Sequence, residues 1–142
     1  MPRKTDHSPQ LSYKERYDLV RHPKRIRSSD VIEGVFDNLI YYGSPDPSLI
    51  AATGSVKGID CIILGQEKPR KGKKSKATGM VKPEGFGFGL EMLSQAEKNR
   101  IPVVSIIDTY GGDPSMESEM GGQSFLISDS ISRFCDANTP TV

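Results

Sequence analysis

A short apolar segment between a helix-forming stretch and a glycine-rich stretch most constrains the fold of this chain. Residues 102–108 (Pro-Val-Val-Ser-Ile-Ile-Asp) are rich in β-branched side chains, which is typical of a parallel strand covered on both faces. Before it, apolar residues recur at helical spacing from Phe86 to Ala96, so we expect a helix that opens at 82–85 and ends by Asn99. This alternation predicts an α/β domain with parallel crossovers.

Two apolar stretches upstream predict a β-hairpin. They cover residues 49–56 and 59–65 and are separated by Lys57 and Gly58, a pair suited to a tight turn. The second stretch (Ile-Asp-Cys-Ile-Ile-Leu-Gly) is the more apolar, so we expect it to be buried.

Further elements are expected on both sides of this centre. Apolar residues between Val31 and Ile40 follow the N-capping residues 28–30 and predict one helix over 28–40. Residues 109–122 are expected to be a glycine-rich loop and 127–135 a helix. Residues 139–142 resemble the start of another strand, which suggests a truncated product or an N-terminal piece of a longer protein.

Composition fits one domain with a modest core. The chain has 142 residues, 35% of them hydrophobic and 26% charged, with a net charge of +1. Its longest apolar run, 101–107, is too short to cross a bilayer, and the N-terminus lacks an apolar signal core, so we expect no membrane contact and a location in the cytoplasm or the plastid stroma. Cys61 and Cys135 have no metal-ligand spacing and are both expected to be buried thiols.

Charge is distributed unevenly along the chain. Residues 1–30 contain eight Lys and Arg against four Asp and Glu. We expect residues 1–20 to form a flexible basic tail, with a short helix around 13–20. A second basic run, residues 70–76, is expected to be a solvated loop. It could bind the phosphates of a nucleotide-bearing substrate or of nucleic acid, or merely confer solubility.

The leading candidate site is the segment 108–114 (Asp-Thr-Tyr-Gly-Gly-Asp-Pro), directly after the predicted strand 102–108. Open α/β sheets bind ligands at the carboxyl ends of their strands. Adjacent glycines, Gly111 and Gly112, allow close approach of the backbone, whose N–H groups could form an oxyanion hole. The alternative is a tight turn without chemistry. Asp108 could be a Mg²⁺ ligand, an acyl-phosphate nucleophile or an acceptor of backbone N–H groups.

Five segments of the chain carry motifs that resemble one known family. They read Arg-His-Pro-Lys-Arg at 21–25, Ile-Leu-Gly-Gln-Glu-Lys at 63–68, Gly-Met-Val-Lys-Pro-Glu-Gly-Phe at 79–86, Ile-Pro-Val-Val-Ser-Ile-Ile-Asp-Thr-Tyr-Gly-Gly-Asp-Pro at 101–114, and Gly-Gln-Ser at 122–124. In combination they resemble A-R-H-P-x-R-P, I-I-G-H-Q-K-G, G-M-P-x-P-E-G-Y, L-P-I-I-T-F-I-D-T-P-G-A-Y-P and G-Q-S of the carboxyltransferase α subunit of multi-subunit acetyl-CoA carboxylase.

The resemblance implies a crotonase-like ββα spiral, incomplete at the C-terminus. Residues 21–142 would be a carboxyltransferase domain that stops before the family's second glycine-rich segment, which supplies further oxyanion donors. The implied reaction moves a carboxyl group from carboxybiotin, borne by a biotin carboxyl carrier protein, to acetyl-CoA and forms malonyl-CoA for fatty-acid biosynthesis. The implied partner is the carboxyltransferase β subunit, which holds the family's zinc, so no metal is expected here and no turnover is expected from this chain alone.

Site residues follow from the resemblance position by position. Gly111 and Gly112 fall on the glycine-alanine of the family's G-A-Y-P-G loop and are the predicted catalytic donors. The predicted substrate-binding residues come from the pocket wall and from the basic run. They are Gly79, Met80 and Gly85 in the wall, and Arg70, Lys73 and Lys74 in the run.

The sequence departs from the family at three places near the expected pocket. Tyr110 replaces a proline, residues 113–115 (Asp-Pro-Ser) replace Tyr-Pro-Gly, and Gln66 replaces a histidine. These departures would place a charge and a bulkier ring there. Two alternative functions stay open: a non-catalytic module that binds a partner or RNA, and another CoA-ester enzyme of the crotonase-like group.

Overall fold

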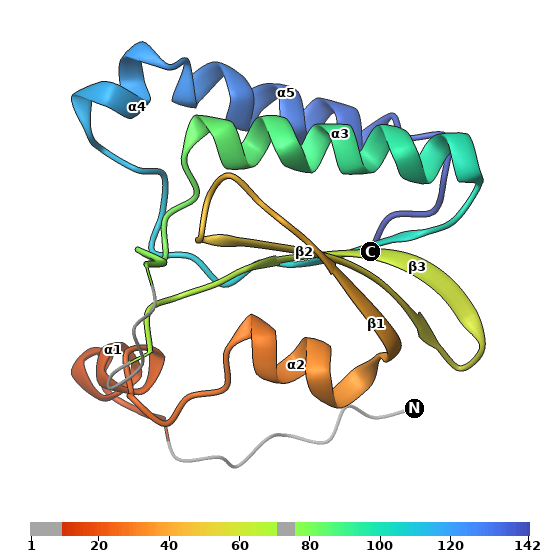
Figure 1. Cartoon of the computed structure of the whole chain (residues 1–142). Coiled ribbons are helices and arrows are strands. Elements are labelled where there is room, and N and C mark those ends of the chain that lie inside the picture. The colour runs from red at the N-terminus through yellow and green to blue at the C-terminus, as the bar shows by residue number, and fades with distance from the viewer. Residues whose placement is uncertain (1–9, 71–75) are drawn as a thin grey trace, which may run out of the picture.

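The computed structural model describes residues 10–70 and 76–142. One mixed sheet lies between helices on both of its faces (Figure 1). The elements in chain order are α1 (Tyr13–Val20), α2 (Ser28–Val35), β1 (Asp37–Tyr42), β2 (Leu49–Val56), β3 (Ile59–Gln66), α3 (Pro83–Asn99), β4 (Val103–Ile106), α4 (Met116–Met120) and α5 (Gln123–Cys135).

The sheet confirms the predicted hairpin and the predicted parallel crossover. Its strand order is β1-β2-β3-β4, with β1, β2 and β3 antiparallel and β4 parallel to β3. Lys57 and Gly58 both have positive φ, 51° and 78°, as a two-residue hairpin turn requires. Thr141 forms a parallel bridge with Val103, which places the expected start of a further strand beside β4.

The two faces of the sheet have separate cores. Alternate residues of β3 point to opposite faces, so Cys61 and Ile63 pack with α2, whereas Ile62 and Leu64 pack with α3. Figure 1 shows α2 on one side of the sheet and α3 with α5 on the other. The chain therefore has an α2 face and an α3/α5 face, names that we keep below.

The helix predicted over 28–40 is shorter than expected. It ends at Val35, and Asn38 has the left-handed φ of 55°, after which the chain continues as β1. Residues 40–42 pair with Thr53, Ala52 and Ala51 of β2. The apolar spacing of residues 31–40 is compatible with a helix throughout and also with a helix followed by a strand. The Ile-Tyr-Tyr sequence at 40–42 favours a strand, and pairing with β2 stabilises it there.

Three smaller expectations also need correction. The strand predicted over 102–108 spans only 103–106, and Ile107 just beyond it is 74% exposed. Both faces of the strand are covered as expected, since Val103 belongs to the core beside α3, and Val104 and Ile106 pack against the core beside α2. The loop predicted over 109–122 contains the short helix α4, which Ser115 caps by accepting from the Ser118 N–H. Cys61 is buried, but Cys135 is exposed because it ends α5.

The remaining expected helices are present. A helix at 13–20 is found as α1, α3 ends at Asn99 with Arg100 in the left-handed conformation, and α5 contains the predicted 127–135. Within the described residues, no helix combines the length and apolar character that a bilayer crossing requires.

Candidate functional site

The predicted glycine loop follows β4 directly and is bonded to a second loop that precedes α3. Gly79 lies in that second loop, and its carbonyl accepts hydrogen bonds from the Tyr110 N–H (3.0 Å) and from Thr109 Oγ1 (2.8 Å). A Cβ on Gly79, whose φ is +84°, would lie 2.7 Å from the Tyr110 ring. Gly79 thus permits the close approach of the two loops that the sequence predicted to form the site.

The two predicted donors differ in their hydrogen bonding. Gly111, at φ +138°, donates its N–H to Thr109 Oγ1 at 3.0 Å, so this group is already engaged. The Gly112 N–H donates to no acceptor within residues 10–70 and 76–142. Of the two, Gly112 is therefore the one whose N–H is free to bind a ligand.

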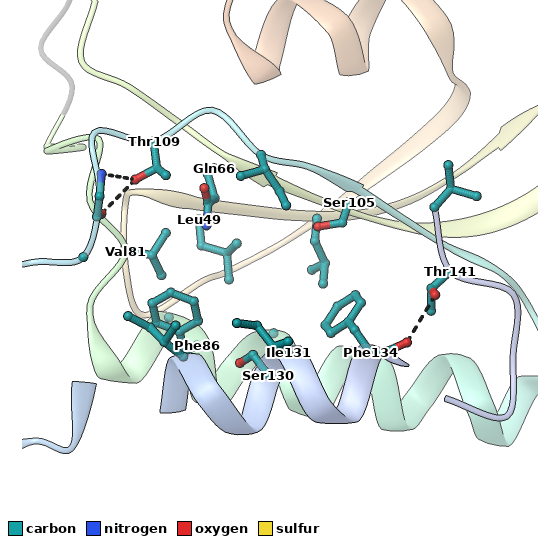
Figure 2. Close-up of a pocket in the computed structure, with 18 residues that line it drawn as sticks. Leu49, Gln66, Val81, Phe86, Ser105, Thr109, Ser130, Ile131, Phe134 and Thr141 are labelled. Carbon is teal, nitrogen blue, oxygen red and sulfur yellow. Dashed lines mark hydrogen bonds between the residues drawn. The ribbon is translucent and has the colours of Figure 1, made fainter. Parts of the chain in front are cut away.

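Both glycines line a cavity of 530 Å³ between the sheet and the helices α3 and α5. Figure 2 shows Thr109, Gln66 and Phe86 toward one end of the cavity and Phe134 and Thr141 toward the other, with Ile131 between them. The lining is predominantly apolar. It consists of Leu49, Leu64, Gln66, Val81, Gly85, Phe86, Gly89, Ser105, Ile107, Thr109, Gly111, Gly112, Ile127, Ser130, Ile131, Phe134, Thr141 and Val142.

The start of α3 is fixed against a buried carboxylate. Asp46 accepts from the Ser48 N–H (2.8 Å) and from the Lys82 N–H (2.7 Å), the latter at the N-cap of α3. A Cβ on Gly85 would lie 2.8 Å from Asp46 Oδ2, so only glycine fits there. Sequence reasoning missed Asp46. The available signal was an aspartate flanked by Pro45 and Pro47, a composition typical of side-chain-stabilised turns.

Asp108 has a role that the sequence did not predict. Its Oδ1 accepts from Lys68 Nζ and from Arg25 Nη1, each at 2.7 Å. Burial disfavours ionisation of Asp108, but the hydrogen bonds and charges of Lys68 and Arg25 outweigh burial and lower its pKa. The predicted acceptance of backbone N–H groups is replaced by these two ion pairs. Asp108 Oδ2 is buried and has no hydrogen-bond partner.

Aromatic and cationic side chains extend this cluster outward. Lys68 Nζ lies 4.7 Å from the centroid of the Tyr110 ring, and the Arg21 guanidinium lies 5.6 Å from it and 3.9 Å from the Tyr17 ring. These distances allow cation–π attraction. Tyr110 thereby connects α1 with the glycine loop.

Two of the departures from the family motif lie outside the lining of the cavity. Neither Tyr110 nor Asp113 lines it. Asp113 is buried and accepts from the Ser115 N–H at 2.9 Å, a bond that lowers its pKa. Gln66, the third departure, does line the cavity, and its Oε1 is buried without a hydrogen-bond partner.

The other predicted substrate-binding residues are more dispersed. Gly85 lines the cavity, whereas Gly79 and Met80 do not. Arg70 also lies outside the lining and pairs with Asp30 of α2, with 2.6 Å between Nη2 and Oδ2. Lys73 and Lys74 fall outside the described residues, so phosphate contact by the basic run stays a prediction. Among the described residues, no cluster of three or more His, Cys, Asp or Glu side chains could hold a metal ion.

Comparison with known proteins supports the motif-based interpretation. Residues 3–142 match the family described as "Acetyl co-enzyme A carboxylase carboxyltransferase-like". The chain belongs to this family. It is 34% identical over 139 residues to the acetyl-coenzyme A carboxylase carboxyl transferase subunit alpha of Wolinella succinogenes, and 29% identical over 135 residues to that of Protochlamydia amoebophila.

These alignments cover 93% and 90% of this chain but only 45% and 43% of the relatives. The chain thus spans less than half the length of the curated relatives that it matches.

Solved structures show the same fold. The transcarboxylase 12S structure with hydrolysed methylmalonyl-coenzyme A bound matches with a TM-score of 0.71 at 20% identity, over 96% of this chain and 27% of the other. The β subunit of P. aeruginosa geranyl-CoA carboxylase matches with a TM-score of 0.67 at 17% identity, over 99% and 26%. The fold is that of the crotonase-like carboxyltransferases, as the resemblance implied.

Proposed function

We propose that this chain contributes part of the active site of an acetyl-CoA carboxylase carboxyltransferase. In this reaction a carboxyl group passes from carboxybiotin on a biotin carboxyl carrier protein to acetyl-CoA, and malonyl-CoA forms. The proposed partners are a carboxyltransferase β subunit, the carrier protein and the CoA thioester. Family membership over residues 3–142 supports the reaction class, and the placement of the glycine loop beside a cavity supports the location of the site.

The free Gly112 N–H is the observation on which the assignment of the site rests. An acetyl thioester must lose a proton from its methyl group before it can accept a carboxyl group, and negative charge then develops on the thioester oxygen. A fixed N–H donor stabilises that charge. Thr109 aids indirectly, since its hydroxyl accepts from the Gly111 N–H and donates to the Gly79 carbonyl, which fixes the loop.

The residues at this end of the cavity also fit a biotin ureido group. A ureido group offers a carbonyl oxygen and an N–H; the free Gly112 N–H would be a donor to the carbonyl oxygen, and Gln66 lines the same cavity. Carboxybiotin would supply the activated carboxyl group. None of these contacts requires a nucleophilic side chain in this chain.

A chimera tests the proposal. Residues 3–142 would replace the matching part of the Wolinella succinogenes relative, and malonyl-CoA formation would be measured with its β subunit and carboxylated carrier protein. Gly112→Pro removes the N–H, whereas Gly112→Ala retains it, so the matched pair isolates the donor. We expect Gly112→Pro to lower kcat about 10²–10³-fold and Gly112→Ala to lower it far less.

Equal losses in the two variants would refute the role of the Gly112 N–H. A chimera that folds and binds its β subunit yet forms no malonyl-CoA would refute the proposed reaction. Binding to the β subunit is therefore measured first, by size-exclusion chromatography of the mixed proteins.

A further inference from the structure

An ion-pair cluster lies at the start of the glycine loop, and the proposed reaction assigns it no role. Asp108 Oδ1 accepts from Lys68 Nζ and from Arg25 Nη1, each at 2.7 Å. None of the three side chains lines the cavity, so the cluster does not contact a ligand there. Only residues 109–111 separate Asp108 from Gly112. This placement allows the cluster to act on the reaction through the loop.

Lys68 is held in place by the segment that follows β3. Its side chain is 2% exposed. The preceding residue, Glu67, donates its backbone N–H to the Ser48 carbonyl at 2.9 Å, and its carboxylate accepts from the Ser29 N–H and hydroxyl, both at 3.0 Å. Glu67 is thereby bonded to the start of β2 and to the start of α2. Lys68, next to it, offers Asp108 a fixed partner.

Lys68 contacts both of the loops that form the site. Its Nζ lies 4.7 Å from the centroid of the Tyr110 ring, in addition to its bond with Asp108. Its stem passes close to Gly79, since a Cβ there would lie 3.1 Å from Lys68 Cγ. The Gly79 carbonyl in turn accepts from the Tyr110 N–H at 3.0 Å. One buried side chain thus holds the glycine loop against the loop that precedes α3.

The other end of the glycine loop is fixed by α5. A Cβ on Gly112 would lie 3.3 Å from Ile127 Cδ1 and 3.5 Å from Gln123 Nε2, so the backbone there passes close to that helix. The Gly112 N–H is therefore placed by α5 on one side and by the short connection to Asp108 on the other. A functional group must lie within about 0.5 Å of its productive position. Release of one end of the loop is then sufficient to misplace the donor.

We propose that Asp108 is a positioning residue, which its ion pair with Lys68 holds in place so that the Gly112 N–H is directed at the substrate oxygen. Arg25, whose side chain is 38% exposed, strengthens the pair from the solvent side. The inference rests on the proposed function for the role of the Gly112 N–H. It adds that this donor is effective only while the ion pair holds the loop.

A double-mutant cycle in the chimera tests the proposal. Asp108→Ala removes the carboxylate, Gly112→Pro removes the donor, and kcat and KM for acetyl-CoA are measured for both single variants and for the double variant. We expect Asp108→Ala to lower kcat about 10²-fold, the effect of a small misplacement. KM should change less than about threefold, because the bond to the oxygen strengthens only as charge develops. In the Gly112→Pro background, Asp108→Ala should lower kcat no more than about twofold further, since the donor is already absent.

Phe36→Ala is the matched control for lost stability. Phe36 is buried in the core of the α2 face and lies outside the cavity lining. Its truncation should leave kcat and KM of the folded chimera unchanged. Asp108→Asn, which keeps an oxygen acceptor without the charge, repeats the cycle if Asp108→Ala fails to fold, and a smaller decrease in kcat is then expected.

Nuclear magnetic resonance of the unmodified-length chain, labelled at its glycine nitrogens, reports on the loop without any assay of activity. The Gly112 amide signal is identified by its absence from Gly112→Ala. Asp108→Ala should broaden or split this signal, because the released loop samples several positions. Phe36→Ala should leave it unchanged.

The outcomes separate this inference from the proposed function. Multiplied losses of kcat in the double variant, an equal loss in Phe36→Ala, or a Gly112 signal that Asp108→Ala leaves unchanged would overturn the positioning role and leave the proposed reaction standing. A Gly112 signal that Asp108→Ala broadens, together with a chimera that binds its β subunit but forms no malonyl-CoA, would support the hold of Asp108 on the loop and overturn the proposed reaction.

Discussion

One glycine on each face of the sheet shows how differently the two faces are packed. On the α2 face, a Cβ added at Gly65 would lie 3.0 Å from Ile32 and 3.1 Å from Ser28, so the missing side chain lets α2 contact β3 closely. On the α3/α5 face, a Cβ added at Gly89 would lie 3.8 Å from its nearest neighbour. The same sheet therefore has a close-packed core on one side and a pocket on the other. Rigid packing on the α2 face can support a site whose opposite face is left partly empty.

The largest expected loss of stability comes from truncating a side chain at the centre of the α2 face. Ile63 is fully buried there. We expect Ile63→Ala to lower the free energy of unfolding by about 4 kcal/mol, because a closed core cannot fill the gap. Leu64→Ala should lower the free energy of unfolding by only about 2 kcal/mol. Leu64 borders the cavity, so its side chain has fewer van der Waals contacts that the substitution can remove.

Urea unfolding of the two variants measures this difference directly. Equal losses would mean that the α3/α5 face is as closely packed in solution as the α2 face. The slope of the transition should stay constant, so that the midpoints can be compared.

The second largest loss of stability is expected from the ion-pair cluster of Arg25, Lys68 and Asp108. This cluster joins the segment before α2 to the segments that follow β3 and β4. Asp108→Asn leaves Lys68, whose side chain is 2% exposed, without its carboxylate. We expect a loss of about 3 kcal/mol at pH 7, because an uncompensated buried charge is strongly unfavourable. Urea unfolding measures the loss. Asp18→Asn is the matched control, since Asp18 lies on the exposed surface of α1 and its replacement reports the effect of removing an acidic charge alone.

The same cluster predicts a pH dependence. Because the pKa of Asp108 is lower in the folded chain than in the unfolded chain, its contribution is complete above the unfolded pKa of about 3.9 and is lost as the pH falls through the folded pKa. Between about pH 5 and pH 3, the stability of the unmodified chain should fall more steeply than that of Asp108→Asn. Asp113, whose pKa is also lowered, is present in both and cancels. Parallel slopes would contradict the ion pairs.

Local signals explain which parts of the fold could be predicted. The hairpin depends on a two-residue turn, and α3 depends on helical periodicity with a proline at its start, so neighbouring residues suffice for both. The change from α2 to β1 escaped prediction because Val31 to Ile40 fit a helix until Asn38 adopts a positive φ and β2 offers a partner. Pairing of β1 with β2 outweighed the helical pattern of these residues.

Parts of the site depend on contacts between distant residues and could not be predicted. The motifs located Gly111 and Gly112, but the engagement of one N–H and not the other depends on where the Thr109 hydroxyl points. Asp108 meets Arg25 and Lys68, which lie 83 and 40 residues away. No spacing in one sequence reveals such pairs. The cavity is likewise a gap between elements, which periodicity does not report.

A smaller effect tests close packing on the α2 face. Gly65→Ala should lower the free energy of unfolding by about 2 kcal/mol, because Ile32 and Ser28 must move to admit a methyl group. Gly43→Ala is the control, since a Cβ there meets nothing within 4 Å. Thermal unfolding of both variants measures the effect. If Gly65→Ala were as stable as Gly43→Ala, α2 would not be held as closely against β3 as the structure indicates.

The smallest effect has the opposite sign and lies on the α3/α5 face. Gly89→Ala should raise the free energy of unfolding by about 0.5–1 kcal/mol, because alanine favours the helix and restricts the unfolded chain. Its methyl group would enter the cavity at ordinary contact distances from Leu49 and Leu64. Gly87→Ala, which meets open space, reports the helix effect without the contacts, so the difference between the two variants measures what filling the cavity contributes. A loss of stability in Gly89→Ala alone would show that α3 lies closer to the sheet in solution, and the contrast between the two faces would then disappear.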